Sequence, residues 1–180
     1  MDNPGNRIVM IENNGFKIVR DLMLEITTYD MEGKANQLTQ VFAEAQPTSV
    51  KNYIPIKETI DGLRKEKGMF LSLRLLDKSK KIVSDNFYWL PNSDEKYTGL
   101  QQMKTAAATM QAKREGADKI VVIITNPANG PVSFFNRVSL INPGTKKRIL
   151  PVFYSDNYVS VLPGETKTIT LEYTPDKTNT

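Results

Sequence analysis

Cysteine and histidine are both absent from the 180 residues of this chain. Without cysteine there can be no disulfide, no thiolate zinc site and no thiol nucleophile. Without histidine there can be no Ser-His-Asp triad, no imidazole metal ligand and no imidazole general base. An enzyme built from this sequence would have to work with carboxylates, lysine, tyrosine or serine. The composition therefore favours a binding or structural module over an enzyme.

Signals for targeting or membrane insertion are also missing. The segment Met1–Gly5 has neither a basic region nor an apolar run, so it does not predict a signal peptide. The longest aliphatic run, Ile120–Ile124, is far too short to span a bilayer, and we expect no membrane partner. The lack of cysteine fits a reducing compartment, but periplasmic and secreted bacterial proteins can lack it too. The compartment is therefore undetermined.

The excess of basic residues is small. The chain has 24 Lys and Arg against 20 Asp and Glu, which gives a net charge of +4 and a pI near 9.2. Nucleic-acid-binding domains often have a pI above about 9, but their basic residues gather on one face. Here they form two short clusters, Lys78–Lys81 and Lys146–Arg148, each beside a turn signal. Solvated hairpin tips explain both clusters, so we expect no nucleic-acid partner.

Hydrophobic and polar residues alternate along most of the chain, which is the period of a β-strand. In the clearest run, Val19–Tyr29, the side chains of Leu22, Leu24, Ile26 and Thr28 share one face. Further strands are predicted at residues 8–13, 38–45, 69–76, 120–125, 132–141, 149–154, 158–162 and 166–173. Turn residues separate these runs, and Asn142-Pro143-Gly144 and Pro163-Gly164 each suit a type II turn. The sequence predicts an all-β protein.

A domain boundary is predicted near the middle of the chain. The aromatic stretch Phe87–Leu90 is followed by Pro91-Asn92-Ser93-Asp94, a composition typical of a linker. Short strands on both sides of it predict two β-sandwiches, residues 1–92 and residues 93–180. We expect Trp89, which precedes the linker, to be at least partly buried near the junction.

Residues 99–114 do not fit the strand pattern clearly. Strong helix formers dominate this stretch, and propensity alone favours a helix. However, Ala106, Ala108, Met110 and Ala112 also alternate, and the flanking segments are strands. The residues alone leave both helix and strand open.

No catalytic, cofactor or metal site is predicted. Paired carboxylates could hydrolyse glycosidic bonds without histidine, but nearly all acidic residues here lie at turns, where solvated Asp and Glu are expected. Asn129-Gly130-Pro131 is too short for a phosphate-binding loop and lacks its lysine. A calcium loop of alternating acids is missing as well.

The sharpest candidate binding residues are Tyr154, Asp156, Asn157 and Tyr158. Flat rings beside amide and carboxylate groups suit the recognition of sugars, whose C–H faces stack on aromatic rings. Loops at strand ends are also where sandwiches commonly carry binding residues. The alternative is that Asp156 and Asn157 only cap their own turn.

A long stretch of the second half resembles a known family. It comprises Phe134–Leu140, the tip Thr145–Arg148 and the run Ile149–Glu165, which contains Pro-Val-Phe-Tyr-Ser-Asp-Asn-Tyr and Leu-Pro-Gly-Glu. These residues resemble the C-terminal immunoglobulin-like domain of family 2 glycoside hydrolases, in the β-mannosidase, endo-β-mannosidase and exo-β-glucosaminidase branch.

The first half resembles the preceding immunoglobulin-like domain of the same enzymes. The matching features are the Asp30–Gly33 turn, the Leu71–Leu76 strand and the Asn86–Leu90 ending. The resemblance thus implies two tandem immunoglobulin-like β-sandwiches, with residues 104–114 in an extended strand.

In that family an upstream (β/α)-barrel domain supplies the acid/base and nucleophile glutamates. Nothing in this chain resembles the barrel, so no catalytic residue is carried over. The resemblance implies a C-terminal part of such an enzyme, inactive alone, whose partner is the barrel of the same polypeptide. The domains would buttress the barrel and shape its sugar pocket.

Two alternatives remain at this point. The chain could be an independent carbohydrate-binding module, which would carry an exposed aromatic platform. It could also be an adhesion protein built from immunoglobulin-like repeats. An accessory domain should instead carry an apolar patch that its barrel covers.

Overall fold

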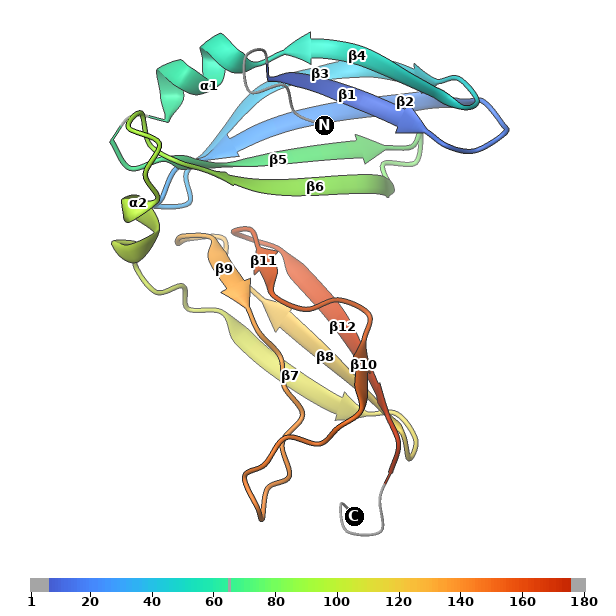
Figure 1. Ribbon diagram of the computed structural model, residues 1–180, viewed down its shortest axis with the longest axis vertical. Helices are drawn as coiled ribbons and strands as arrows, with labels where there is room; N and C mark the ends of the chain where they lie inside the picture. The colour runs from blue at the N-terminus through green and yellow to red at the C-terminus, as the bar shows by residue number, and fades with distance from the viewer. Residues whose placement is uncertain (1–6, 65, 176–180) are drawn as a thin grey trace. The chain divides into compact units, whose positions relative to one another are not determined.

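The computed structural model describes residues 7–64 and 66–175, which form β-strands with two short helices, α1 (Lys57–Leu63) and α2 (Thr98–Gln101) (Figure 1). The chain divides into two compact units, Met1–Met103 (unit 1) and Lys104–Thr180 (unit 2). The predicted all-β class is confirmed. Neither α1 nor α2, within these described ranges, combines the length and hydrophobicity that a membrane-spanning helix requires.

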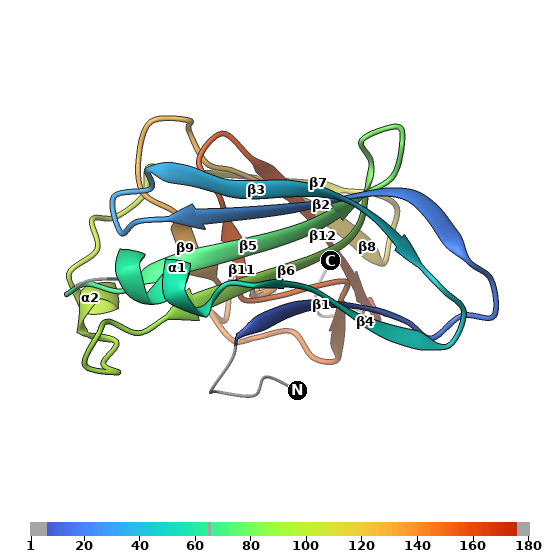
Figure 2. The same cartoon turned by 90° about the horizontal axis from the view of Figure 1, so that it is seen from above.

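Unit 1 contains one four-stranded and one two-stranded sheet, both antiparallel. The larger sheet has the order β3-β2-β5-β6, and β1 pairs with β4 in the smaller one. The strands are β1 (Ile8–Asn13), β2 (Val19–Tyr29), β3 (Ala35–Ala45), β4 (Ser49–Pro55), β5 (Met69–Leu76) and β6 (Ile82–Leu90). Helix α1 follows β4 and lies at the end of the unit where β2 ends and β3 begins (Figure 2).

The core of unit 1 follows the alternation read from the sequence. Leu22, Leu24, Ile26 and Thr28 are all buried along β2, as predicted from their shared face. Helix α1, which the sequence pattern did not reveal, adds the fully buried Ile60 to this core. Burying such aliphatic side chains stabilises the fold by about 1.5–3 kcal/mol each.

Three tight turns of unit 1 share one construction, anchored by Asp30, Asp77 and Asn92. In each, the side-chain oxygen of the anchor accepts hydrogen bonds from the backbone N–H groups two and four residues later. The third residue after each anchor has a positive φ. Two of the turns were predicted, and the basic cluster Lys78–Lys81 is confirmed as a solvent-exposed hairpin tip.

Unit 2 has a four-stranded sheet of order β10-β12-β8-β7 and a second sheet in which β9 pairs with β11, with antiparallel pairing throughout. The strands are β7 (Thr109–Arg114), β8 (Lys119–Thr125), β9 (Ser133–Asn136), β10 (Val152–Tyr154), β11 (Val159–Val161) and β12 (Thr166–Tyr173). Its core joins Val122 and Ile124 of β8 to Ile169 and Leu171 of β12 and to side chains of the second sheet. This is a β-sandwich arrangement.

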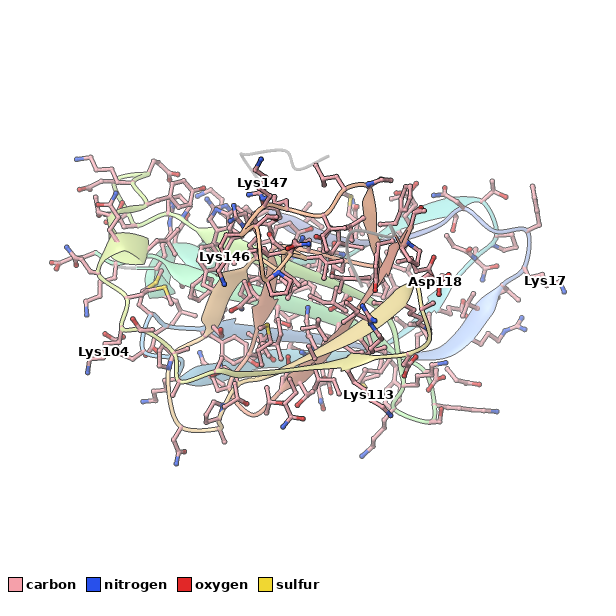
Figure 3. All side chains as sticks on the ribbon, turned by 90° about the horizontal axis from the view of Figure 1, so that it is seen from below. Lys17, Lys104, Lys113, Asp118, Lys146 and Lys147 are labelled. Atoms are coloured by element: carbon pink, nitrogen blue, oxygen red, sulfur yellow. The ribbon has the colours of Figure 1, made fainter. Side chains whose placement is uncertain are left out.

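Several predicted strands of unit 2 are shorter in the structure. The segments 132–141 and 149–154 are strands only at Ser133–Asn136 and Val152–Tyr154. Outside these strands the two segments meet at the bridge between Ile141 and Arg148, and the side chain of Asn157 pairs with the backbone of Val138. Alternation alone does not reveal these contacts. The Lys146–Arg148 cluster is exposed in the turn that follows Asn142, where Figure 3 labels Lys146 and Lys147.

The ambiguous stretch 99–114 contains both structures. Residues 98–101 form the single helical turn of α2, and Thr109–Arg114 form strand β7. Residues 104–108 are irregular, so the predicted strand at 104–114 is confirmed only for its second part. The alternating Met110 and Ala112 pair with Ile124 and Val122 of β8. Residues 109–114 therefore form a strand because they pair with β8, although their local propensity favours a helix.

The side chain of Trp89, which was expected to be partly buried, retains 40% of its surface exposed. Trp89 lies on β6, an edge strand of its sheet, opposite Phe70 of β5. Its surface is thus partly covered, whereas Phe70 opposite it is fully buried.

Candidate interface at the 154–158 bend

Residues 155–158 connect β10 to β11 in unit 2 and contain the predicted binding residues. Ser155 fixes the start of this bend to β12. Its backbone N–H donates to the carbonyl oxygen of Thr170 (2.9 Å), and its Oγ accepts from the backbone N–H of Thr170 (2.9 Å). The chain is thus tied to one sheet just before it crosses to the other.

Asn157 holds the other side of the bend. Its Nδ2 donates to the carbonyl oxygen of Val138 (2.9 Å), and its Oδ1 accepts from the backbone N–H of Val138 (2.8 Å). The same Oδ1 also accepts from the backbone N–H of Tyr158 (2.8 Å). The amide therefore pairs with Val138 as a neighbouring strand would. It caps its own turn, and it also joins two segments 19 residues apart.

Tyr154 and Asp156 occupy different surroundings. The half-buried ring of Tyr154 packs against the core of unit 2, and its hydroxyl oxygen accepts a hydrogen bond from the backbone N–H of Leu140 (3.3 Å). Asp156 is exposed, and its Oδ1 accepts from the backbone N–H of Asn157 (2.7 Å). Of the four predicted residues, Tyr154 and Asn157 therefore hold the fold, whereas Asp156 and Tyr158 reach the surface.

The exposed ring of Tyr158 belongs to an aromatic group that the sequence did not predict. It lies 5.1 Å from the ring of Phe135, centroid to centroid, at an angle of 42°, and Phe134 stacks on Phe135 at 5.5 Å. Phe135 and Tyr158 keep 47% and 49% of their surface exposed. An aromatic pair half open to solvent is a typical composition for a docking surface.

Both exposed rings sit on strained backbone. Phe135 has φ 58° and Tyr158 has φ 56°, which is the left-handed region that bulky residues rarely adopt. The neighbouring amide of Asn136 stabilises this arrangement, because its Nδ2 donates to the carbonyl oxygens of Ser133 (2.8 Å) and Val159 (3.0 Å). Simple alternation could not place Phe135, since a positive φ interrupts the regular order of side chains.

The described carboxylates with a shifted pKa lie in unit 1. The pKa of Asp61 is held below its ordinary value of 3.8, first by the hydrogen bond from Lys57 (2.5 Å) and also by the charge of Arg64 (2.9 Å) and Arg7, although burial opposes the shift. Such a carboxylate stays ionised and is unsuited to act as a general acid near neutral pH.

A cleft of about 730 Å³ also opens in unit 1, between the end of α1 and the turn from β2 to β3. Two of its acidic residues, Asp30 and Glu32, already have structural partners. Asp30 Oδ1 accepts the backbone N–H groups of Glu32 and Lys34, and Glu32 forms an ion pair with Lys67 (2.8 Å). Within the described ranges, no group of three or more acidic side chains is placed to hold a metal ion.

Comparisons with known proteins agree with this architecture. Residues 86–180 match the family model described as the exo-β-D-glucosaminidase Ig-fold domain. An exo-β-D-glucosaminidase of Streptomyces avermitilis is 28% identical over 193 aligned residues, which cover 93% of this chain and 21% of that protein. A mannosylglycoprotein endo-β-mannosidase of Lilium longiflorum is 29% identical over 57% of this chain and 11% of its own length.

Solved structures show the same relationship. The exo-chitosanase CsxA of Amycolatopsis orientalis matches 93% of this chain with a TM-score of 0.71 and 25% identity, and this match covers 22% of that chain. A β-D-mannosidase from Dictyoglomus thermophilum has the same fold at a TM-score of 0.64 and 14% identity, over 96% of this chain and 19% of that one. The chain thus spans between 11% and 22% of the length of these relatives. It belongs to the immunoglobulin-fold domains of the exo-β-D-glucosaminidase family, within family 2 of the glycoside hydrolases.

Proposed function

We propose that this chain supplies non-catalytic accessory domains to a family 2 glycoside hydrolase that acts on β-linked glucosamine or mannose residues. The observation that supports this most strongly is that nearly all of this chain matches only a small part of a larger relative. The match to CsxA extends over 93% of this chain but only 22% of that protein. The activity in the relatives' names therefore belongs to polypeptides about five times longer, of which this fold is one part.

The role proposed for the two units is to buttress the catalytic barrel of the same polypeptide. Unit 2 offers a surface suited to it at the 154–158 bend. Tyr158 is half exposed, and the side chain of Asn157 fixes the adjacent backbone through Val138. A rigid aromatic side chain loses little conformational entropy on docking, so it contributes strongly to an interface.

The bend would also form part of the rim of the sugar pocket. Asp156 is exposed next to Tyr158, and a carboxylate beside an aromatic ring suits a protonated amino sugar. In this role Asp156 and Tyr158 would face the ligand or the barrel. Tyr154 and Asn157 would act indirectly, by holding the bend against Leu140 and Val138.

The test is made in the full-length parent enzyme. Tyr158→Ala should lower its melting temperature or its kcat/KM for the glycoside substrate, because the ring would be lost from the interface or from the rim. Phe153→Ala is a matched control, since Phe153 is an exposed aromatic residue on neighbouring β10. If Tyr158→Ala equals the Phe153→Ala control in both measurements, the bend has no role beyond its own turn.

An independent carbohydrate-binding role is the second candidate, and the exposed ring of Tyr158 beside Asp156 is the feature that favours it. This role requires affinity in the isolated chain. Titration of the chain with a soluble glucosamine oligosaccharide, followed by NMR shifts of unit 2 amides, separates the two roles. Saturable shifts centred on residues 155–158 would favour the binding module, whereas their absence would favour the accessory role.

A further inference from the structure

Two Asn-Gly sequences lie in exposed loops, and the structure treats them differently. Asn-Gly is the dipeptide in which asparagine loses its amide most readily, because glycine has no side chain to hinder attack by its own backbone nitrogen. One pair is Asn14-Gly15, between β1 and β2. The other is Asn129-Gly130, between β8 and β9.

The attacking nitrogen of the first pair is occupied. The backbone N–H of Gly15 donates to Oδ1 of Asn13 (3.0 Å). Asn13 is itself held in place, since its Nδ2 donates to the carbonyl oxygens of Lys17 (2.9 Å), Ala45 (3.1 Å) and Gln46 (3.0 Å). The Gly15 nitrogen must break this hydrogen bond before it can lose its proton and attack the side chain of Asn14.

The second pair has no such protection. Among the residues that the structure describes, the backbone N–H of Gly130 has no hydrogen-bond acceptor. Space is also open around it, because a Cβ built on Gly130 would meet no heavy atom within 4 Å. The exposed side chain of Asn129 can therefore rotate toward this nitrogen.

We infer that Asn129 is a site of spontaneous deamidation, whereas Asn14 is protected by the side chain of Asn13. In this reaction the backbone nitrogen of Gly130 forms a bond to Cγ of Asn129. The side-chain amide leaves as ammonia and takes up the proton of that nitrogen, which gives a cyclic succinimide. Water then opens the ring to aspartate or isoaspartate. No oxidant, reductant or enzyme is needed.

The modification would change the loop that closes one end of unit 2. Isoaspartate inserts an extra backbone carbon into the loop between β8 and β9. The two ends of this loop are joined by Asn126, whose Nδ2 donates to the carbonyl oxygen of Pro131 (3.0 Å). The same residue binds the 162–165 turn, where the N–H of Gly164 donates to the Asn126 carbonyl oxygen (3.0 Å). Deamidation would thus add a negative charge and loosen two neighbouring loops.

The test is peptide mapping by mass spectrometry after incubation of the purified full chain in mildly alkaline buffer. In the peptide that contains Asn129, deamidation to aspartate or isoaspartate should be about tenfold faster than in the peptide that contains Asn14. This is the rate difference expected from one hydrogen bond of ordinary strength. In urea both rates should converge, because the folded structure alone distinguishes the two pairs. Equal rates in the folded chain, or faster conversion at Asn14, would overturn the inference.

Variants of Asn13 test the protecting contact directly. Asn13→Ala removes the acceptor and should speed conversion at Asn14 about tenfold. Asn13→Asp retains an acceptor and should keep Asn14 protected, which controls for a general loosening of the loop. If Asn13→Asp releases Asn14 as much as Asn13→Ala does, the hydrogen bond to Gly15 is not what protects it. In both variants Asn129 should convert at the wild-type rate.

Discussion

At the scale of single residues, asparagine side chains fasten loops in a chain that has no disulfides. Asn126 is 1% exposed, and its Nδ2 donates to the carbonyl oxygens of Pro131 and Val161, each at 3.0 Å. Asn92 and Asn157 bridge distant segments in the same way. The amides of Asn126 and Asn92 are buried, and they satisfy backbone groups in places where a group without a partner is costly. Loop order in this protein therefore depends on a few amides.

Replacement of Asn126 by alanine should lower the free energy of unfolding by about 2–3 kcal/mol, because the buried carbonyl oxygen of Val161 and the partly buried one of Pro131 lose their donor. Urea denaturation followed by circular dichroism, with hydrogen exchange at the β8 and β12 amides, would measure the loss. Asn129→Ala is the matched control on the same loop, and it should change stability by less than about 0.5 kcal/mol. Equal effects of the two substitutions would contradict the proposed role of Asn126.

Asp77 should make the stability of unit 1 depend on pH. Its pKa lies below the ordinary value of 3.8, chiefly because of the hydrogen bond from Ser79 and then that from the backbone N–H of Lys81. The folded state therefore gains stability from the ionised group above pH 3.8, and this gain is lost as the pH falls through the lower folded-state pKa.

An Asp77→Asn variant tests this pH dependence. Its free energy of unfolding should fall less than that of the wild type between about pH 5 and about pH 2, because the substituted side chain does not titrate. Lys78→Gln, at the same exposed tip, should keep the wild-type slope. Identical slopes for Asp77→Asn and the wild type would show that the turn does not bind the carboxylate preferentially in its ionised form.

At the scale of elements, the sequence predicted local structure correctly where a single pattern, such as alternation or a Pro-Gly turn, determines it. The alternation of Leu22, Leu24 and Ile26 predicted the buried face of β2, and Pro163-Gly164 predicted a turn in which Gly164 has φ 79° and the Glu165 N–H donates to the Leu162 carbonyl oxygen. The analogous prediction at Asn142-Pro143-Gly144 was wrong. There the side chain of Asn142 accepts the N–H groups of Gly144 and Thr145, and the positive φ lies at Lys146.

The candidate site was only partly accessible from the sequence. The residue types at 154–158 indicated a bend with surface groups, and Asp156 and Tyr158 are indeed exposed. The partners that define the bend, Val138 and Phe135, come from a segment about 20 residues earlier, and no local pattern indicates that contact. Helix α1 was missed for a similar reason, because a single buried residue, Ile60, is too little for a helical period.

Helix α2 depends on a close approach that only glycine permits. A Cβ on Gly99 would lie 1.8 Å from the carbonyl oxygen of Lys67, a backbone atom that cannot rotate away. Gly99→Ala should therefore destabilise unit 1 by about 2 kcal/mol or more. Gly62→Ala is the opposite control. A Cβ on Gly62 in α1 would meet nothing within 4 Å, and alanine favours a helix more than glycine does, so this substitution should raise stability by up to about 1 kcal/mol. Thermal unfolding of both variants measures these effects. If Gly99→Ala and Gly62→Ala shift the melting temperature in the same direction, the close contact between Gly99 and Lys67 does not determine the effect of the Gly99 substitution.

At the scale of the whole molecule, the chain belongs to the immunoglobulin-fold domains of family 2 glycoside hydrolases. The chain has no histidine or cysteine, and the structure engages Asp61 and Glu32 in ion pairs and Asp30 and Asp77 in turns. The aromatic pair of Phe135 and Tyr158 lies instead at a surface. These features suit a domain whose partner is another part of a larger enzyme.

The isolated chain should hydrolyse no glycoside. Nitrophenyl β-glucosaminide, β-mannoside and β-galactoside are the appropriate substrates, and release of nitrophenol measures turnover. A mock purification from the same host without the expressed chain controls for contaminating enzymes. Turnover that exceeds this control and copurifies with the chain would refute the non-catalytic role.

The central claim is that this chain stabilises a catalytic barrel, and thermal unfolding of the barrel tests it most directly. The catalytic part of the parent enzyme is prepared separately, and its melting temperature is measured with increasing amounts of the chain. The account predicts a rise that depends on concentration, because a partner that binds only the folded barrel stabilises it by mass action. It also predicts a smaller rise with the Tyr158→Ala chain. A melting temperature that stays constant in excess chain, together with separate elution of the two proteins in gel filtration, would contradict it.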